Sequence, residues 1–200
     1  MKTQQELREI FSQQGNLLST DTLRRAGIHY QLLQKLIQDG MVESVRRGWY
    51  QWIADRVPSD AETLVRLFPD AVFCMHTALF HYGYTDRVPQ AWHLAVSNVS
   101  NRKRFCLNYP LIHPHYWRPE IQQLGVTATE MDGVSVPMHN RDRVICDYLR
   151  FRRQMDREIF NKAIQAYLAD EKKNIANLLQ YADRLRCRQH VSTFIEPWLS

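Results

Sequence analysis

The 200-residue sequence predicts an α+β protein of two domains, spanning residues 1–57 and 58–200. In the first part, short helical patterns lead into a strand-rich stretch. In the second part, two helical segments precede several strand-like ones, and helical patterns continue from about residue 142. The boundary is placed near residue 57 because an apolar aromatic run ends there. Pro58, followed by Ser59 and Glu62, is typical of a capped helix start.

The composition excludes several other classes of protein. With 44% hydrophobic residues, 24% charged residues, 7 Gly and 8 Pro, the chain is neither low-complexity nor disordered. No segment approaches the roughly 18 to 20 apolar residues of a membrane helix, and residues 1–7 form no apolar signal core. We therefore expect a cytoplasmic protein with no membrane partner.

The cysteines at positions 74, 106, 146 and 187 form no CxxC pair, so we expect reduced, buried thiols, no metal site and no cofactor. The formal net charge of +5 permits a nucleic-acid partner without requiring one.

Three short helices are expected in the first part. The first ends at Gly15, the second begins at Ser19 and ends at Gly27, and the third ends at Gly40. The apolar residues that recur at helical spacing are Leu7, Ile10, Phe11, Leu23, Ala26, Leu32, Leu33, Leu36 and Ile37.

A β-hairpin is expected next. Residues 41–45 and 49–53 are rich in β-branched and aromatic side chains, and Arg46-Arg47-Gly48 between them is typical of a hairpin tip. We expect Tyr50 to face the core, with Trp49 and Trp52 facing outward.

This order of elements predicts a winged helix-turn-helix, with a tight turn at Ala26-Gly27 between the second and third helices and the hairpin as the wing. In such domains the third helix enters the DNA major groove. The acid of that helix, Asp39, lies at its far end. Its polar face suits phosphates and base edges and consists of His29, Tyr30, Gln31, Gln34, Lys35 and Gln38.

The candidate DNA-binding residues follow from this arrangement. Those expected to approach base edges in the major groove are Tyr30, Gln31, Gln34 and Lys35. Arg46 and Arg47, on the wing, are expected to bind the flanking DNA backbone. Arg24 and Arg25 are expected to bind DNA phosphates where the second helix crosses a DNA strand.

The second part is expected to hold a small antiparallel or mixed sheet supported by helices. The expected strands are residues 92–97, 105–112, 126–131 and 134–138, the last two joined by a hairpin at Asp132-Gly133. Helices are expected from Ser59 to about residue 68, over residues 74–82, and repeatedly from Asp142 onward, ending with residues 191–199.

Several short motifs run along the chain. Those of the first part are Leu23-Arg-Arg-Ala-Gly27, Leu33-x-x-Leu36, Gly40 and Val45-Arg46-Arg47-Gly48-Trp-Tyr50. Those of the second part are His76-Thr-Ala-Leu79, His81-Tyr-Gly83, Val88-Pro89 and Arg141-Asp-Arg143-Val-Ile-Cys-Asp147. Together they resemble the AbiEi family, the repressor antitoxins of abortive-infection (type IV) toxin–antitoxin operons. Arg143 departs from the family's R-T-x-x-D helix, which has Thr at that position.

The resemblance covers about residues 3–155. It implies a two-domain protein that represses its own operon by binding inverted repeats in double-stranded DNA, as a homodimer or a cooperative pair. It also implies neutralisation of a nucleotidyltransferase-like toxin encoded beside it, and leaves direct contact with that toxin open.

Other functions remain open at this point. The same DNA-binding domain could serve a regulator that senses a small molecule, or a protein-interaction module that has lost DNA binding. A metal-dependent nuclease could use Asp70 and Glu171, although these are far apart and Glu171 has a helical setting. The phosphate-loop, GxSxG, HExxH and deaminase motifs are absent from the sequence, so we expect no enzyme.

Isolated histidines and arginines allow weaker hypotheses. His113 and His115 share a strand face and could begin a metal site, whereas His76 and His81 are expected in the core. The basic group 102–104 is expected to solubilise a loop, with a nucleic-acid or toxin contact left open. Arg150, Arg152 and Arg153 are expected to complement a helix macrodipole, with phosphate binding left open.

Overall fold

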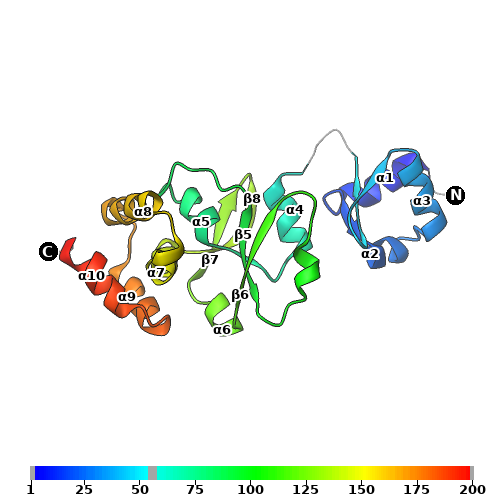
Figure 1. The fold of residues 1–200 in the computed structure, drawn as a ribbon. Helices are drawn as coiled ribbons and strands as arrows, with labels where there is room; N and C mark the ends of the chain where they lie inside the picture. Colours follow the sequence, from blue (N-terminus) through cyan, green and yellow to red (C-terminus); the bar gives the residue numbers. More distant parts are fainter. Residues whose placement is uncertain (1–2, 54–57, 199–200) are drawn as a thin grey trace. The chain divides into compact units, whose positions relative to one another are not determined.

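The computed structural model describes residues 3–53 and 58–198, and its chain divides into two compact units, Met1–Pro69 and Asp70–Ser200 (Figure 1). The domain junction predicted near residue 57 lies outside the described residues. The chain mixes helices with small sheets, which confirms the predicted α+β class.

The first unit alternates helices and short strands. Its elements are α1 (Gln4–Ser12), β1 (Leu17–Ser19), α2 (Thr20–Arg25), α3 (Tyr30–Gln38), β2 (Val42–Arg46), β3 (Trp49–Trp52) and α4 (Asp60–Leu67). Strand β3 lies between β1 and β2 and is antiparallel to both. The predicted helices and hairpin strands are confirmed, whereas the short β1 was missed.

Side-chain caps explain where several helices begin. Thr3 and Glu6 form a reciprocal capping box at α1, because each side chain accepts a hydrogen bond from the other residue's backbone N–H. Ser19 accepts from the Thr22 N–H at the start of α2, and Ser59 accepts from the Glu62 N–H at the start of α4.

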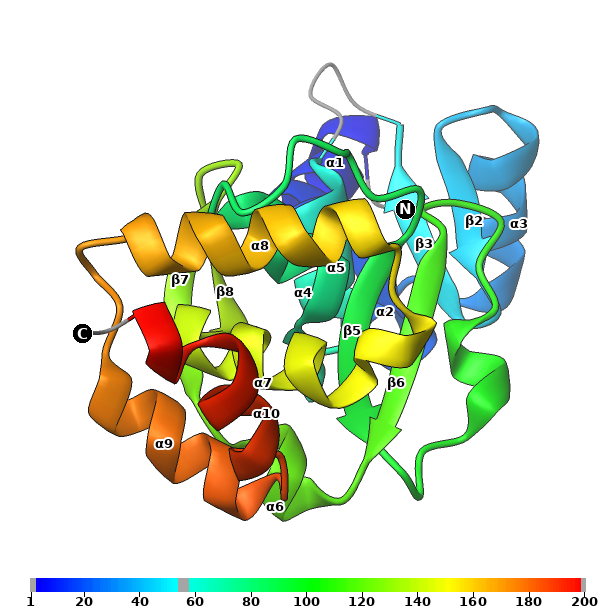
Figure 2. The same ribbon diagram turned by 60° about the vertical axis from the view of Figure 1, so that its left-hand side comes forward.

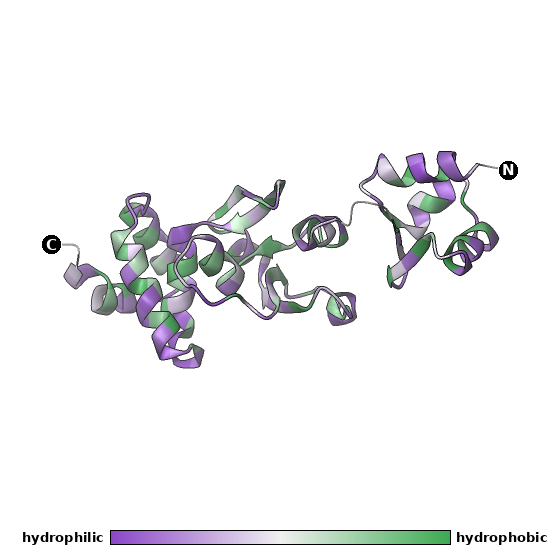
Figure 3. Cartoon of the chain, turned by 90° about the horizontal axis from the view of Figure 1, so that it is seen from above, coloured by the Kyte–Doolittle hydropathy of each residue, from purple (hydrophilic) through white to green (hydrophobic). Residues whose placement is uncertain are grey.

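The core of the first unit is one apolar cluster that gathers side chains from its helices and its sheet. The cluster includes Leu7, Phe11, Leu18, Leu23, Ile28, Leu33, Leu36, Val42 and Trp52. Figure 3 shows apolar and polar residues alternating along these helices, as expected of elements with one buried face.

The expectation that Trp52 faces outward was wrong. Trp52 is only 5% exposed, and its ring lies 5.4 Å from that of Phe11. Side chains two residues apart lie on the same face of a strand, so Trp52 shares the core-facing side of β3 with Tyr50. Trp49, on the other side, is half-buried.

The second unit is built on a mixed sheet, one of the two arrangements that the sequence left open. Its strands are β4 (Val72–Phe73), β5 (Trp92–Ser97), β6 (Ile112–Trp117), β7 (Val126–Met131) and β8 (Val134–His139), in the order β6-β5-β4-β8-β7. The β5–β6 and β4–β8 pairs are parallel, and the other pairs are antiparallel. Asp132 and Gly133 both have positive φ, consistent with the predicted tight hairpin turn between β7 and β8.

The helices of this unit are α5 (Met75–His81), α6 (Pro119–Gln122), α7 (Arg141–Phe151), α8 (Arg157–Ala169), α9 (Ile175–Arg184) and α10 (Arg188–Phe194). Helix α7 packs against α5, α8, α9 and α10, and Figure 2 shows α7–α10 gathered beside the sheet. Short 3₁₀ turns cover Arg102–Phe105, Arg152–Gln154 and Glu196–Trp198.

The strand predicted over residues 105–112 was wrong. Phe105 ends a 3₁₀ turn, and β6 begins only at Ile112. Phe105 is buried, with its ring 6.0 Å from that of Tyr116, while Leu111 is 55% exposed. The segment is therefore a loop, and Phe105 is the side chain that anchors it.

A buried ionic group joins α7 to the sheet. Arg143 and Asp147 are fully buried, and Arg143 Nε donates to Asp147 Oδ2 at 3.0 Å. Arg143 Nη1 also donates to the carbonyls of Ile121 and Leu124, at 2.7 and 2.8 Å. These bonds satisfy Arg143 Nε and Nη1, whereas Nη2 is buried without a hydrogen-bond partner among the described residues.

His139 and Trp117 complete the surroundings of this ion pair. His139 Nε2 lies 2.8 Å from the Gln122 carbonyl oxygen, and its ring stacks on that of Trp117 at 5.4 Å. The Arg143 guanidinium lies 5.0 Å from the centre of the Trp117 ring. Burial favours the neutral form of Asp147, but Arg143 and His139 outweigh it, so the pKa of Asp147 is lowered.

We predict that Arg143→Met will lower the free energy of unfolding by about 3–5 kcal/mol, because it leaves Asp147 buried without its cation. Chemical denaturation monitored by circular dichroism measures this loss. The double variant Arg143→Met with Asp147→Leu is expected to recover much of it, because no buried charge remains. A single variant as stable as the parent would contradict this account.

Candidate nucleic-acid interface

Helix α3 exposes one continuous polar face. Leu33 and Leu36 enter the core, which leaves Tyr30, Gln31 and Lys35 on the surface and Gln34 half-buried. Tyr30 is 73% exposed. The four candidate residues thus lie on one side of one helix, because positions four residues apart share a face.

The electrostatics of this face favour an anion. The first turn of α3 contains no acidic residue, and Asp39 caps the opposite end of the helix. Amide and ammonium groups are the side chains that hydrogen-bond base edges and phosphates. The positively charged side chain, Lys35, is exposed.

A tight turn fixes α2 relative to α3. Gly27 has a φ of +75°, and the Ile28 N–H donates to the Leu23 carbonyl at 2.9 Å. Ile28 is buried in the core just after the turn. The left-handed backbone at Gly27 is what allows the chain to reverse so quickly.

The two candidate arginines of α2 lie in its last turn, and both are exposed. Arg24 pairs with Asp21 at 2.9 Å, but both side chains are about 70% exposed, so water screens the pair and it is easily exchanged. Arg25 is exposed beside it.

The two arginines at the hairpin tip have different surroundings. Arg47 is exposed at the turn, next to Gly48 with its φ of +80°. The side chain of Arg46 instead packs within the first unit: its Nη2 donates to the Leu67 carbonyl at 3.3 Å, and its guanidinium lies 5.1 Å from the centre of the Phe68 ring. Arg47 is therefore the better placed of the two for an external ligand.

Sequence reasoning missed one contact that positions this tip. The backbone N–H and the hydroxyl of Thr20 both donate to the Gly48 carbonyl, at 2.8 and 3.2 Å. The start of α2 is thereby tied to the end of the hairpin. Strand β1, which directly precedes Thr20, brings this about by pairing with β3.

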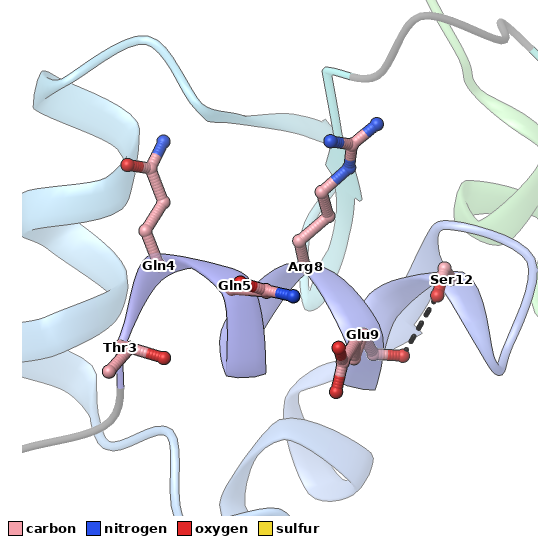
Figure 4. Close-up of a pocket in the computed structure, with 6 residues that line it drawn as sticks. All are labelled: Thr3, Gln4, Gln5, Arg8, Glu9 and Ser12. Atoms are coloured by element: carbon pink, nitrogen blue, oxygen red, sulfur yellow. Dashed lines mark hydrogen bonds between the residues drawn. The ribbon is translucent and has the colours of Figure 1, made fainter.

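A hollow of about 630 Å³ lies along α1 and is drawn in Figure 4. Its lining comes from one helix and its N-cap: Thr3, Gln4, Gln5, Arg8, Glu9 and Ser12. Because these side chains rise from a single element, they do not converge on a common point as catalytic groups do.

The second unit brings His76 together with the His113–His115 pair through His93, which the sequence had not singled out. His93 Nδ1 lies 2.9 Å from His115 Nε2, and the His93 ring stacks on those of His113 and His115. His76 lies beside His93, and its Nδ1 is 2.6 Å from the Tyr148 hydroxyl. This histidine cluster depends on the parallel register of β5 and β6, which sequence spacing does not reveal.

The cluster does not form a metal centre in this structure. Across residues 3–53 and 58–198, no group of three or more His, Cys, Asp or Glu side chains is arranged to hold a metal ion. Asp70, the nuclease candidate, is instead paired with Arg104 through a hydrogen bond of 3.0 Å. Glu171 follows α8 in a turn, so its predicted helical setting was wrong.

The described cysteines are free thiols. Cys74, Cys146 and Cys187 are buried, as predicted, but Cys106 is exposed because it belongs to the loop that replaces the expected strand. Burial raises the pKa of the Cys74 thiol well above its usual range, which keeps that thiol protonated and unreactive.

These features define a mixed α+β chain whose first unit presents an exposed polar helix face. Among solved structures, the chain is similar to the RV2827C protein from Mycobacterium tuberculosis, with a TM-score of 0.69 and 11% sequence identity. The match covers 96% of this chain and 75% of the other, and at this identity it establishes a shared fold alone. No protein-family model and no curated protein matches the sequence.

Within the described part of the chain, no helix has both the length and the apolar character needed to cross a membrane.

We predict that acidification destabilises the protein through the histidine cluster. Burial, together with the neighbouring histidines, lowers the pKa of His93 to about 2 and that of His115 to about 4. Below pH 6.5 the unfolded chain takes up protons that the folded rings resist. Stability is thus complete above about pH 6.5 and is lost as the pH falls toward the folded-state values.

The loss should not exceed about 1.4 kcal/mol per pH unit for each such ring, and partial exposure reduces it. Urea denaturation across this pH range measures it. His93→Gln should flatten the pH dependence, and His29→Gln, at an exposed position, should leave it unchanged. An equally steep profile for both variants would remove the cluster from the explanation.

Proposed function

We propose that this protein is a sequence-specific DNA-binding transcriptional repressor of the AbiEi antitoxin type, with a winged helix-turn-helix in its first unit. The observation that carries the proposal is the exposed polar face of α3, held outward by the burial of Leu33 and Leu36. The order α1, β1, α2, α3, β2, β3 supports it as well, since a tight α2–α3 turn followed by a hairpin is the arrangement of winged-helix DNA readers.

In this proposal α3 lies in the major groove. Gln31 and Gln34 read adenine through paired amide hydrogen bonds, and Lys35 reads guanine or holds a phosphate. Tyr30, which is 73% exposed, reaches a base edge or the DNA backbone beside it.

The flanking arginines position the domain without reading sequence. Arg24 and Arg25, at the end of α2, hold phosphates on one side of the groove. Arg47 grips the backbone from the hairpin. The packing of Arg46 on Phe68 gives that residue mainly a supporting role.

The antitoxin role rests on the sequence resemblance alone. It would make the operator a pair of inverted repeats upstream of the protein's own gene, occupied by a homodimer or a cooperative pair. A nucleotidyltransferase-like toxin would be encoded in the same operon.

We predict that Gln31→Ala weakens binding to the operator by about 1–3 kcal/mol while leaving binding to random DNA nearly unchanged, because a base contact carries the specificity. Fluorescence anisotropy with DNA from upstream of the gene, and with a shuffled duplex, measures both affinities at one fixed salt concentration. Gln180→Ala, at an exposed position of α9, serves as the matched control and should bind as the parent does. Equal operator affinity for parent and Gln31→Ala, with Gln34→Ala also silent, would overturn the proposed role of α3.

A further inference from the structure

The second unit contains a hollow lined by four arginines. Its volume is about 530 Å³, and its cationic residues are Arg118, Arg150, Arg184 and Arg186. Arg118 is the N-cap of α6, Arg150 lies in the last turn of α7, and Arg184 and Arg186 lie at the end of α9. The residues that line this arginine hollow include no carboxylate.

The four guanidinium groups are available to a ligand. All four residues are exposed, and within residues 3–53 and 58–198 none of them forms an ion pair with an acidic side chain. Four cations around one hollow repel one another unless an anion offsets them.

Helix dipoles account for only part of this charge. The carboxyl ends of α7 and α9 lie at Arg150 and Arg184, and each end carries about half a negative charge. Together they offset about one of the four positive charges, which leaves an excess of roughly three. A multiply charged anion matches that excess.

Arg186 adds a second observation. Its φ is +58°, in the left-handed region, at the position following a helix end where glycine is normally found. A side chain there costs backbone strain, and strained residues concentrate at functional sites. Here the strained position carries a guanidinium at the arginine hollow.

The other residues that line the hollow can contact an uncharged part of a ligand. Tyr116, Ile121 and Leu185 supply an apolar wall, and Asn98 supplies an amide. The volume lies within the range of small-molecule sites. A neighbouring hollow of about 330 Å³ shares Arg150 and adds Arg152 and Arg153, so the positive charge extends past one edge.

From this geometry we propose that the arginine hollow binds a nucleoside polyphosphate. The arginines hold its phosphoryl oxygens by charge-assisted hydrogen bonds, and the nucleoside lies against the apolar wall beside Tyr116. A hollow of about 530 Å³ lined by four arginines has the size of a small polyphosphate site rather than of a channel for a long strand. This inference does not depend on DNA binding by α3, and it assigns the second unit a ligand site of its own.

The test is isothermal titration calorimetry of the full chain with ATP, pyrophosphate and adenosine as separate probes. ATP is expected to bind at one site, pyrophosphate more weakly and adenosine more weakly still. Arg118→Ala and Arg184→Ala should each raise the Kd for ATP about tenfold or more, which is the usual effect of losing one charge-assisted contact. Arg157→Ala, an exposed arginine outside both hollows, is the matched control and should leave the Kd unchanged.

Arg186→Gly separates binding from folding. Glycine relieves the left-handed strain, so the thermal unfolding midpoint should equal or exceed that of the parent, while the Kd for ATP rises. A merely structural role for Arg186 predicts no change in the Kd.

Three results would overturn the proposal: no saturable heat with ATP, adenosine binding as tightly as ATP, or an equal effect of Arg157→Ala. A short single-stranded oligonucleotide that displaces ATP and binds far more tightly would instead assign the arginine hollow to a polynucleotide. Loss of operator binding in Gln31→Ala with intact ATP binding, or the reverse, keeps the two proposals distinguishable.

Discussion

Burial of Leu33 and Leu36 in a small core is the constraint on which the first unit depends. The cluster that holds them also contains Phe11, Leu23 and Trp52, so α1, α2 and β3 all help to fix α3. A helix with one face sealed in this way must turn its glutamines and lysine toward solvent. The Thr20–Gly48 hydrogen bonds then hold the hairpin tip in register with α2. The polar face of α3 is thus exposed because the opposite face of the helix is packed in the core.

Local patterns predicted much of the fold, and contacts between distant residues explain what they missed. Helical spacing and glycine stops located α1, α2 and α3, and the Asp132-Gly133 signal located the β7–β8 hairpin. The short β1 and β4 carry too few residues to show a period. The error at Trp52 came from misassigning alternating faces within a correctly predicted strand. The 105–112 segment failed because a single buried ring, Phe105, anchors an irregular loop.

The candidate sites likewise divide into one that local sequence patterns predicted and others that depend on contacts between distant residues. The α3 face could be predicted because all its residues belong to one helix. The histidine cluster and the arginine hollow draw on α5, β5, β6, α6, α7 and α9, whose proximity depends on tertiary structure. Arg143 and Asp147 are neighbours within α7, but their burial depends on the elements packed around that helix. Basic residues at helix ends suggested dipole complementation, and only the fold shows Arg118 and Arg186 beside them. The two units therefore present different chemistry. The first exposes hydrogen-bonding side chains on α3, and the second gathers positive charge at the arginine hollow.

The most direct test of the central claim is an amide NMR titration of the ¹⁵N-labelled full chain with duplex DNA from upstream of its own gene. The account predicts that the largest chemical-shift changes fall on Tyr30–Gln38 and at the Arg47-Gly48 tip, and that a shuffled duplex gives smaller changes at the same positions. If α3 amides remain unchanged while the DNA binds, the helix is not the reading element and the account is contradicted.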